Sequence, residues 1–333
     1  MKHSVALVIP YFNGGGGMPA YFPYWLKTCG CNKDINFILY TDLCLSRMSV
    51  PDNVRVVQSS FEEFKLDLQA VMPFPVEIGT PYKLCDCKPL FGAALEDDLR
   101  PFEYWGFCDC DLLFGELYPF LFPDNANLDA QRIFSRGHLS IFKNNELNRW
   151  AWRDLPDNGC QNWADALTNA GPRCYDEWGG HVGGGMSMKY ANNNILIDDR
   201  QVFADIRVYS HDFHVVREKY PEYKWETLDA NRVFYWCNGQ LAGLSVTPER
   251  TVRITSYAYC HFQKRQLKIN GNPDGAAYIL SPPNHLISLD APLDLDTTTI
   301  HDVKKMYGTH DYLWELRTFS ERLGRKIQKV VSV

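Results

Sequence analysis

The sequence lacks three features that define familiar protein classes: Cys-x-x-Cys spacings, long apolar runs and an excess of basic residues. Its eleven cysteines are an odd number, and without zinc-type spacings we expect reduced thiols in a cytoplasmic protein. No apolar run reaches the roughly eighteen residues that a membrane-spanning helix needs. The formal charge of −6 argues against nucleic acid as a partner.

Apolar and aromatic residues are abundant instead. Of the 333 residues, 45% are apolar and 14% aromatic, enough for one large domain or two tightly joined ones. The short apolar stretch Val5–Ile9 is stopped by Pro10 and carries no small-residue cleavage site. We therefore expect a first β-strand here, not a signal peptide.

The first third of the sequence alternates between strand and helix patterns. Strands are predicted at Val5–Ile9, Asn36–Tyr40, Val54–Val57 and Trp105–Cys108, and helices at Tyr21–Cys29, after Ser60 and within Tyr82–Leu99. Ser60 has the pattern of a helix N-cap, and Pro89 places the first turn of the last helix around Lys88. This order predicts an α/β fold with a mostly parallel, Rossmann-like sheet flanked by helices, whose ligands bind beyond the carboxyl ends of the strands.

The rest of the chain is less regular. Residues 116–230 are rich in Trp, Asn, Asp and Gly, a composition typical of binding loops on a rigid scaffold. Asn238-Gly239 lies between two apolar runs, which predicts a hairpin with a type I′ turn, and a later strand is expected at Thr251–Tyr259. Val303–Val333 has the pattern of a basic amphipathic helix, which either rests on an anionic membrane or packs on the body of the protein.

Two carboxylates one residue apart end the strand at Trp105–Cys108. Residues i and i+2 of an extended chain point to the same face, so Asp109 and Asp111 can converge on one ion. Hard carboxylate oxygens suit Mg²⁺ or Mn²⁺, which keep open positions for phosphate oxygens. A solvated turn after the strand is the competing interpretation, because short motifs of this kind are common.

Side chains near the other strand ends could complete a nucleotide site. Tyr11 and Phe12 could stack on a nucleobase, and Asp42 could accept a hydrogen bond from a base N–H or a ribose hydroxyl. Lys83 and Lys88 flank the helix that precedes the acidic strand and could reach a diphosphate.

A late strand adds further candidates. His261 could be a third metal ligand, and Lys264 and Arg265 could neutralise a leaving diphosphate. Each of these residues has a structural alternative, since single histidines and lysines more often serve the fold or the surface.

Several segments resemble a group of bacterial surface-polysaccharide glycosyltransferases, which is similar to nucleotide-sugar transferases of the GT-A type. The similarity covers about residues 5–265 and rests on 9–12, 40–42, 81–89, 106–115, 137–139 followed by Asn144, and 261–265. The resemblance implies a GT-A-like fold in which Asp109, Asp111 and His261 bind Mn²⁺ or Mg²⁺ on a nucleoside diphosphate. UDP is the expected nucleotide, because the first two strand ends offer an aromatic pair and an acceptor carboxylate. The glycine-rich segment Gly14–Gly17 departs from the group's pattern and leaves the shape of the first loop open.

On this basis the chain divides into three parts. We expect a nucleotide-sugar-binding half at 1–115, an acceptor-binding and catalytic half of the same domain at 116–275, and a C-terminal helical tail at 295–333. The expected partners are the sugar donor, with galactose or galactofuranose as candidate sugars, and an oligosaccharide or lipid-linked glycan acceptor. Residues 313–333 would supply peripheral contact with the inner membrane.

A carboxylate is also needed to deprotonate the acceptor hydroxyl if the transfer inverts the anomeric centre. Asp176 and Glu177 are the candidates, beside a glycine-rich turn and Trp178, whose ring offers an apolar face to a sugar. His138 and His181 are weaker candidates for hydrogen bonds to the acceptor. An exposed acidic turn with a structural tryptophan is the alternative.

Two other functions remain open from the sequence. A sugar-phosphate nucleotidyltransferase would share the sheet, but its Gly-rich loop usually carries Lys or Arg, which Pro10–Gly17 lacks. A non-catalytic carbohydrate-binding protein would fit the many aromatic residues, but it gives no reason for Asp109, Asp111 and His261 to occur together.

Overall fold

The computed structural model describes residues 2–208, 210–219, 222–225, 232–247, 249, 251–263, 265–295 and 302. The chain forms two compact units, which are described separately: Met1–Cys110 with Glu116–Gln201, and Asp111–Gly115 with Val202–Val333. In the first unit, 116–201 packs with the N-terminal third of the chain. Nearly all of the expected tail at 295–333 lies outside the described residues. In the part of the chain described here, no helix is long and apolar enough to span a bilayer.

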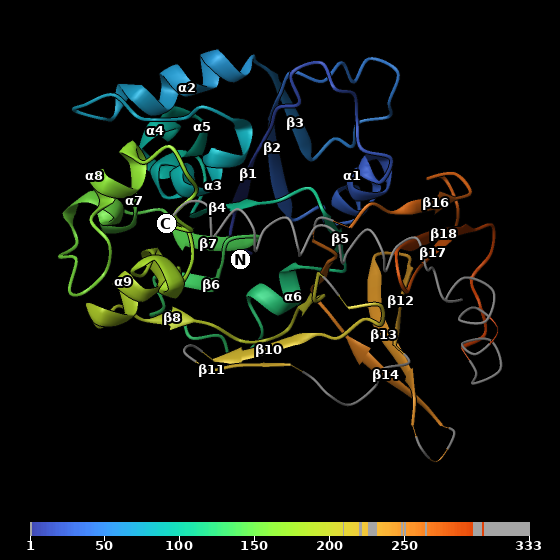
Figure 1. The fold of residues 1–333 in the computed structure, drawn as a ribbon. Helices are drawn as coiled ribbons and strands as arrows, with labels where there is room; N and C mark the ends of the chain where they lie inside the picture. The colour runs from blue at the N-terminus through green and yellow to red at the C-terminus, as the bar shows by residue number, and fades with distance from the viewer. Residues whose placement is uncertain are drawn as a thin grey trace, which may run out of the picture. The chain divides into compact units, whose positions relative to one another are not determined.

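The first unit is built on a seven-stranded sheet with the order β3-β2-β1-β4-β7-β6-β8 (Figure 1). β1 pairs in parallel with β2 and β4, and β2 with β3, while β7 runs antiparallel to β4 and β6. The predicted mixed α/β class with a mostly parallel main sheet is therefore confirmed. The strands are β1 (Val5–Tyr11), β2 (Ile35–Thr41), β3 (Val54–Gln58), β4 (Tyr104–Cys108), β6 (Arg132–Arg136), β7 (Leu139–Lys143) and β8 (Ile197–Asp198).

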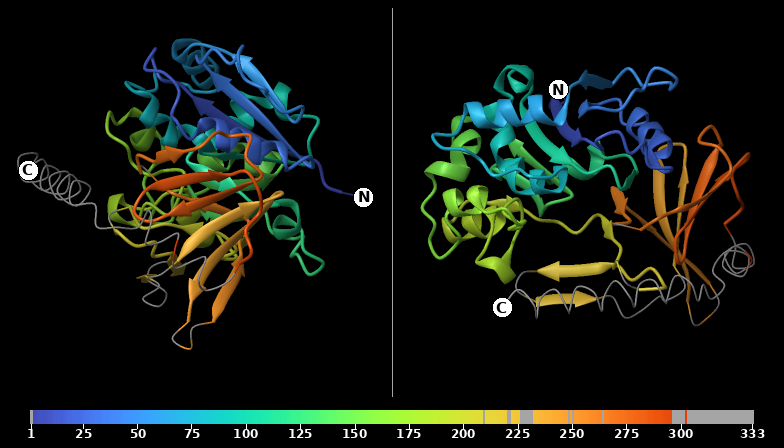
Figure 2. Two further views of the ribbon diagram at one scale, coloured as in Figure 1. Left: turned by 90° about the vertical axis from the view of Figure 1, so that its right-hand side faces the viewer. Right: turned by 45° about the horizontal axis from the view of Figure 1, so that its top comes forward.

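Helices cover both faces of this sheet. They are α1 (Phe22–Gly30), α2 (Phe61–Ala70), η1 (Pro81–Lys83), α3 (Leu84–Cys87), η2 (Lys88–Leu90), α4 (Phe91–Ala94), α5 (Glu96–Leu99), α6 (Tyr118–Leu121), α7 (Glu146–Asp154), α8 (Trp163–Thr168), η3 (Gly180–Val182) and α9 (Met186–Asn192). Ala6 and Val8 on β1 share a buried cluster with Phe64 of α2 and Phe91 of α4. Successive strand residues face opposite sides, and α1 lies on the other side of the sheet from α2 (Figures 1 and 2).

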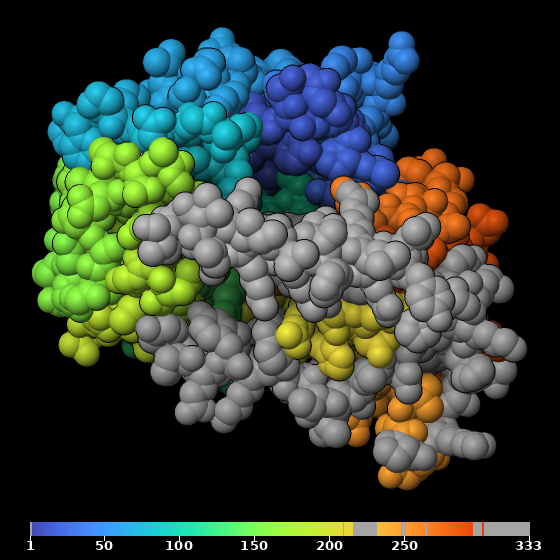
Figure 3. All heavy atoms as spheres, viewed as in Figure 1, coloured from blue at the N-terminus to red at the C-terminus, as the bar shows by residue number. Residues whose placement is uncertain are grey.

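Two of the predicted helices show how the local sequence determines where a helix begins. α2 begins after Ser60, whose hydroxyl accepts the Glu63 N–H while the Glu63 carboxylate accepts the Ser60 N–H, a complete capping box. The light-blue α2 lies on the surface of the first unit in Figure 3, where Leu66 is 68% exposed. The segment before β4 is helical as predicted, but it is broken into short turns and starts at Pro81, not around Lys88. Pro81 itself supplies the first position of that earlier turn.

The second unit is built mainly from antiparallel strands. A six-stranded sheet has the order β14-β13-β12-β17-β18-β16, a three-stranded sheet the order β5-β15-β9, and β10 pairs with β11. The strands are β5 (Leu112–Phe114), β9 (Ala204–Asp205), β10 (Val216–Lys219), β11 (Glu222–Trp225), β12 (Val233–Cys237), β13 (Gln240–Val246), β14 (Val252–Ser256), β15 (Tyr259–His261), β16 (Lys268–Asn270), β17 (Ala277–Ser281) and β18 (His285–Leu289).

The hairpin predicted around Asn238-Gly239 is present between β12 and β13. Both turn residues have positive φ, 49° and 81°, as a type I′ turn requires. The strand expected at Thr251–Tyr259 is split into β14 and β15, which belong to different sheets. This split places His261 on β15, beside β5 and β9.

Candidate functional site

Strand direction explains why several candidate residues of the first unit lie at one edge of its sheet. β1, β2 and β4 run in parallel, so their carboxyl ends point the same way. Tyr11 ends β1, Asp42 follows β2, and Asp109 follows β4. The Asp109 N–H donates to the carbonyl of His138 at 3.0 Å, which fixes the turn after β4.

Lys88 brings two carboxylates of the first unit together. Its Nζ lies 2.7 Å from Asp109 Oδ1 and 3.5 Å from Asp176 Oδ2, and it donates to the carbonyl of Gly137 at 2.7 Å. Burial lowers the pKa of Lys88, but the two neighbouring carboxylates outweigh it and raise the pKa above its ordinary value. The ammonium therefore stays charged and holds the Asp109 and Asp176 side chains in place.

The two candidate bases differ in exposure. Asp176 is 3% exposed, and burial raises its pKa to about 8 while the Lys88 ammonium acts in the opposite direction. Glu177 is half-buried, and its Oε2 accepts the Gly137 N–H at 3.3 Å. A Cβ at Gly137 would lie 2.7 Å from Asp176 Oδ2, so only glycine lets this backbone approach the carboxylates.

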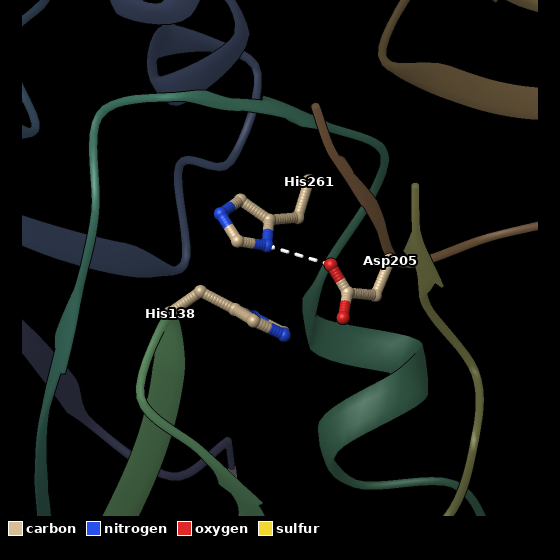
Figure 4. A group of neighbouring side chains, drawn as sticks. All are labelled: His138, Asp205 and His261. Atoms are coloured by element: carbon tan, nitrogen blue, oxygen red, sulfur yellow. Dashed lines mark hydrogen bonds and ion pairs between the residues drawn. The ribbon is translucent and has the colours of Figure 1, made fainter. Parts of the chain in front are cut away.

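The second unit contains a carboxylate–histidine–carboxylate arrangement. β15 places His261 opposite Leu112 of β5 and Asp205 of β9. His261 Nδ1 lies 2.8 Å from Asp205 Oδ1 (Figure 4), and His261 Nε2 lies 3.5 Å from Asp111 Oδ1. Burial lowers the pKa of His261, but Asp111 and Asp205 outweigh it and raise the pKa to about 10.

This arrangement fits a divalent cation. Asp205 holds one ring nitrogen of His261, which fixes the ring so that the other nitrogen faces Asp111. Metal-binding histidines characteristically have such a carboxylate behind them. A carboxylate oxygen and an imidazole nitrogen form a donor set that Mn²⁺ accepts. Asp109, two residues before Asp111 in the chain, offers a second carboxylate.

The candidate nucleotide contacts of the first unit differ in their exposure and in their contacts with the rest of the protein. Tyr11 is half-buried, with its ring centroid 6.0 Å from that of Phe22. Phe12 is only 6% exposed and packs on Phe64 in the core, so its ring faces the protein interior. Asp42 accepts the N–H groups of Asn13 and Gly14, so its carboxylate anchors the glycine-rich loop after β1.

The candidate cations also have structural contacts. Lys83 is 1% exposed and pairs with Asp86 at 2.7 Å, which gives no support to a diphosphate contact. Arg265 is buried and donates to the carbonyls of Arg207 and Ser210 at 2.6 and 2.7 Å. Lys264 lies outside the described residues.

The candidate acceptor contacts belong to the first unit. Trp178 is half-buried, and its indole N–H donates to Ser135 Oγ at 2.9 Å, which orients the ring. His138 is 6% exposed, whereas His181 is exposed, with its Nε2 3.9 Å from Cys174 Sγ.

Sequence reasoning missed Asp205 and Asp86. Asp205 lies on a strand of two residues, too short to show a periodic pattern, and its role depends on pairing with a strand far along the chain. Asp86 lies three residues after Lys83, a spacing that could have indicated the ion pair, but a buried pair cannot be told from a surface pair by spacing alone.

Three solved structures show distant similarity. Mouse xyloside xylosyltransferase 1 is 10% identical, with 63% of this chain and 89% of that chain covered and a TM-score of 0.36. An active-site mutant of LgtC is 10% identical, with 93% and 98% covered and a TM-score of 0.38. A glycosyltransferase involved in glycosylation of the major capsid of PBCV-1 is 9% identical, with 62% and 86% covered and a TM-score of 0.29. Because these TM-scores lie below 0.5, the similarities assign neither a fold nor an activity to this chain.

Sequence comparison gives the family. No curated protein sequence matches the chain. A family model described as a family of unknown function, DUF6625, matches residues 7–290, which includes every candidate metal ligand and candidate base described above. The chain therefore belongs to the DUF6625 family.

Proposed function

We propose that this chain is a metal-dependent glycosyltransferase that moves a sugar from a nucleoside-diphosphate donor, with UDP as the nucleotide, to a glycan acceptor in surface-polysaccharide synthesis. The observation that supports this most is the Asp111–His261–Asp205 arrangement in the second unit. In it Asp111, the second carboxylate of the Asp-x-Asp motif, faces a histidine whose ring is held by Asp205. Galactose and galactofuranose are the candidate sugars.

Asp109, Asp111 and His261 are the proposed ligands of Mn²⁺ or Mg²⁺. When bound there, the cation would neutralise the charge that develops on the leaving diphosphate. Asp205 would hold His261 in the orientation and tautomer that leave Nε2 available as a ligand.

The nucleotide and diphosphate would lie at the carboxyl edge of the first sheet. Tyr11 offers a partly exposed ring there. Asp42 shapes the glycine-rich loop after β1, because its carboxylate accepts the N–H groups of Asn13 and Gly14. Lys88 would hold Asp109 for its ligand role, since it is already paired with that carboxylate. Lys264 stays a proposal from the sequence for neutralising the leaving diphosphate.

Asp176 and Glu177 are the proposed bases for an inverting transfer. The bond from sugar C1 to the diphosphate oxygen breaks, the acceptor oxygen bonds to C1, and the acceptor proton passes to a carboxylate. Glu177 is the more exposed of the two, which favours it for contact with a substrate hydroxyl. Asp176, buried against Lys88, is better placed to fix the orientation of its neighbours.

The acceptor is proposed to be an oligosaccharide or a lipid-linked glycan at the cytoplasmic face of the membrane. Peripheral membrane contact through 313–333 belongs to this proposal and lies outside the described residues.

A donor screen tests the proposal. Nucleotide release is measured from UDP-, GDP- and dTDP-sugars with Mn²⁺ present and then chelated. We expect release from UDP-sugars that stops on chelation. Turnover of GDP-mannose alone, or full activity in chelator, would contradict the proposal. The Asp109→Ala and Asp111→Ala variants separate an enzyme from a binding protein, because a binding protein would keep its ligand while an enzyme would lose turnover.

A further inference from the structure

A buried ion pair next to the candidate base loop has no role in the function proposed above. Lys83 and Asp86 lie 2.7 Å apart in the segment formed by η1 and α3, and their side chains are 2% and 0% exposed. Burying two charges is costly unless each is fully hydrogen-bonded, so the partners of this pair show what it holds in place.

Besides Lys83 and the Cys85 thiol, the partners of Asp86 are two backbone N–H groups of one loop. Asp86 Oδ2 accepts the Arg173 N–H at 2.8 Å, and Asp86 Oδ1 accepts the Tyr175 N–H at 2.9 Å. Tyr175 directly precedes Asp176, and Arg173 lies three residues before it. The Asp86 carboxylate therefore fixes two backbone amides, two residues apart, in the loop that carries both candidate bases.

The partners of Lys83 lie just upstream of that loop. Its Nζ donates to the carbonyls of Ala166 and Gly171 at 2.8 and 2.9 Å, in addition to Asp86. Every polar group of the pair thus reaches backbone between residues 166 and 175. Such contacts determine where a loop runs.

The other end of the same helical segment holds the carboxylates themselves. Lys88, two residues after Asp86, contacts Asp109 Oδ1 at 2.7 Å and Asp176 Oδ2 at 3.5 Å. One short segment therefore fixes the backbone that leads to Asp176 through Asp86, and the Asp176 side chain through Lys88.

We propose that the buried Lys83–Asp86 pair is a positioning device that sets the loop carrying Asp176 and Glu177 relative to Lys88. This inference rests on the proposed function for its catalytic consequence. In this role Lys83 and Asp86 touch no substrate and act only through the loop.

Amide hydrogen exchange in the full chain tests the positioning claim. Asp86→Asn alone leaves the Lys83 charge buried and unpaired, so the charge-free double variant Lys83→Met/Asp86→Asn is the main one. An asparagine can accept one amide but not both, and we expect exchange at Arg173 or Tyr175 to accelerate about tenfold. The matched control is Asn53→Ala, which removes a side chain that donates to the carbonyls of Cys29, Asn32 and Ile35 in another loop.

Kinetics in the same variants test the consequence. We expect kcat for nucleotide release to fall about tenfold to a hundredfold in the double variant, with the Mn²⁺ dissociation constant unchanged. Asn53→Ala should show neither the accelerated exchange at Arg173 and Tyr175 nor the fall in kcat.

Three results would overturn the inference: exchange at Arg173 and Tyr175 no faster than in the control, a loosened loop with unchanged kcat, or Mn²⁺ affinity lost in proportion to kcat. If the wild type releases nucleotide from no donor, the proposed function fails, and the exchange pattern alone then decides whether the pair positions the loop.

Discussion

Removing the carboxylate behind His261 should weaken metal binding without touching a proposed ligand. Asp205 Oδ1 lies 2.8 Å from His261 Nδ1, and the Asp205 side chain is 14% exposed, so water replaces it poorly. In Asp205→Ala the ring keeps its place on β15 but loses the contact that fixes its rotation and tautomer. His261 Nε2, 3.5 Å from Asp111 Oδ1, is then held less firmly toward that carboxylate.

The expected size of the effect follows from similar sites. Removing a carboxylate behind a metal-binding histidine typically lowers metal affinity about 10- to 100-fold. This corresponds to about 1.4 to 2.7 kcal/mol of binding free energy. Loss of His261 itself should cost more, because a ligand is then missing and not only its orientation.

Calorimetric titration with Mn²⁺ measures this effect. Asp212→Ala is the matched control, because Asp212 Oδ1 lies 3.4 Å from His211 Nδ1 in the same unit and is no part of the proposed site. We expect the control to bind Mn²⁺ as the wild type does. Equal affinities for Asp205→Ala and Asp212→Ala would refute the role given to Asp205.

Three further predictions concern the first unit. Because the pKa of Asp176 is raised to about 8, the stability that its protonated form contributes is lost as pH rises from 3.8 through about 8. The melting temperature of Asp176→Asn should therefore rise relative to that of the wild type over this range, and a constant difference between the two would contradict this. Ser60→Ala should lower the free energy of unfolding by about 0.5–2 kcal/mol in urea titrations through loss of the capping box. Gly137→Ala should lower kcat about tenfold or more, because its Cβ would crowd Asp176, whereas Gly79→Ala, with a nearest contact of 3.7 Å, should leave kcat unchanged.

Local patterns predicted the first sheet well. The apolar runs at β1, β2, β3 and β4 and the cap at Ser60 are each encoded within a few neighbouring residues. Alternation of strand and helix then implied parallel pairing, which put Asp42 and Asp109 at one edge. The hairpin at Asn238-Gly239 was predictable for the same reason, since its turn conformation depends on two residues.

What could not be predicted depends on long-range packing. Tyr11 ends an apolar strand and Phe12 follows it directly, and only packing against α2 decides that Phe12 turns into the core. The burial of Lys83 depends on the loop at 166–175, more than eighty residues away in the chain. Asp205 gains its role only when β9 pairs with β15.

The central claim is that Asp109, Asp111 and His261 bind one divalent cation. Anomalous diffraction from crystals grown with Mn²⁺ and UDP tests it most directly. We predict a single strong peak about 2.1 Å from a carboxylate oxygen of each aspartate, with Nε2 of His261 as a further ligand. A peak coordinated by other residues, or UDP ordered with no peak at these side chains, would contradict the claim.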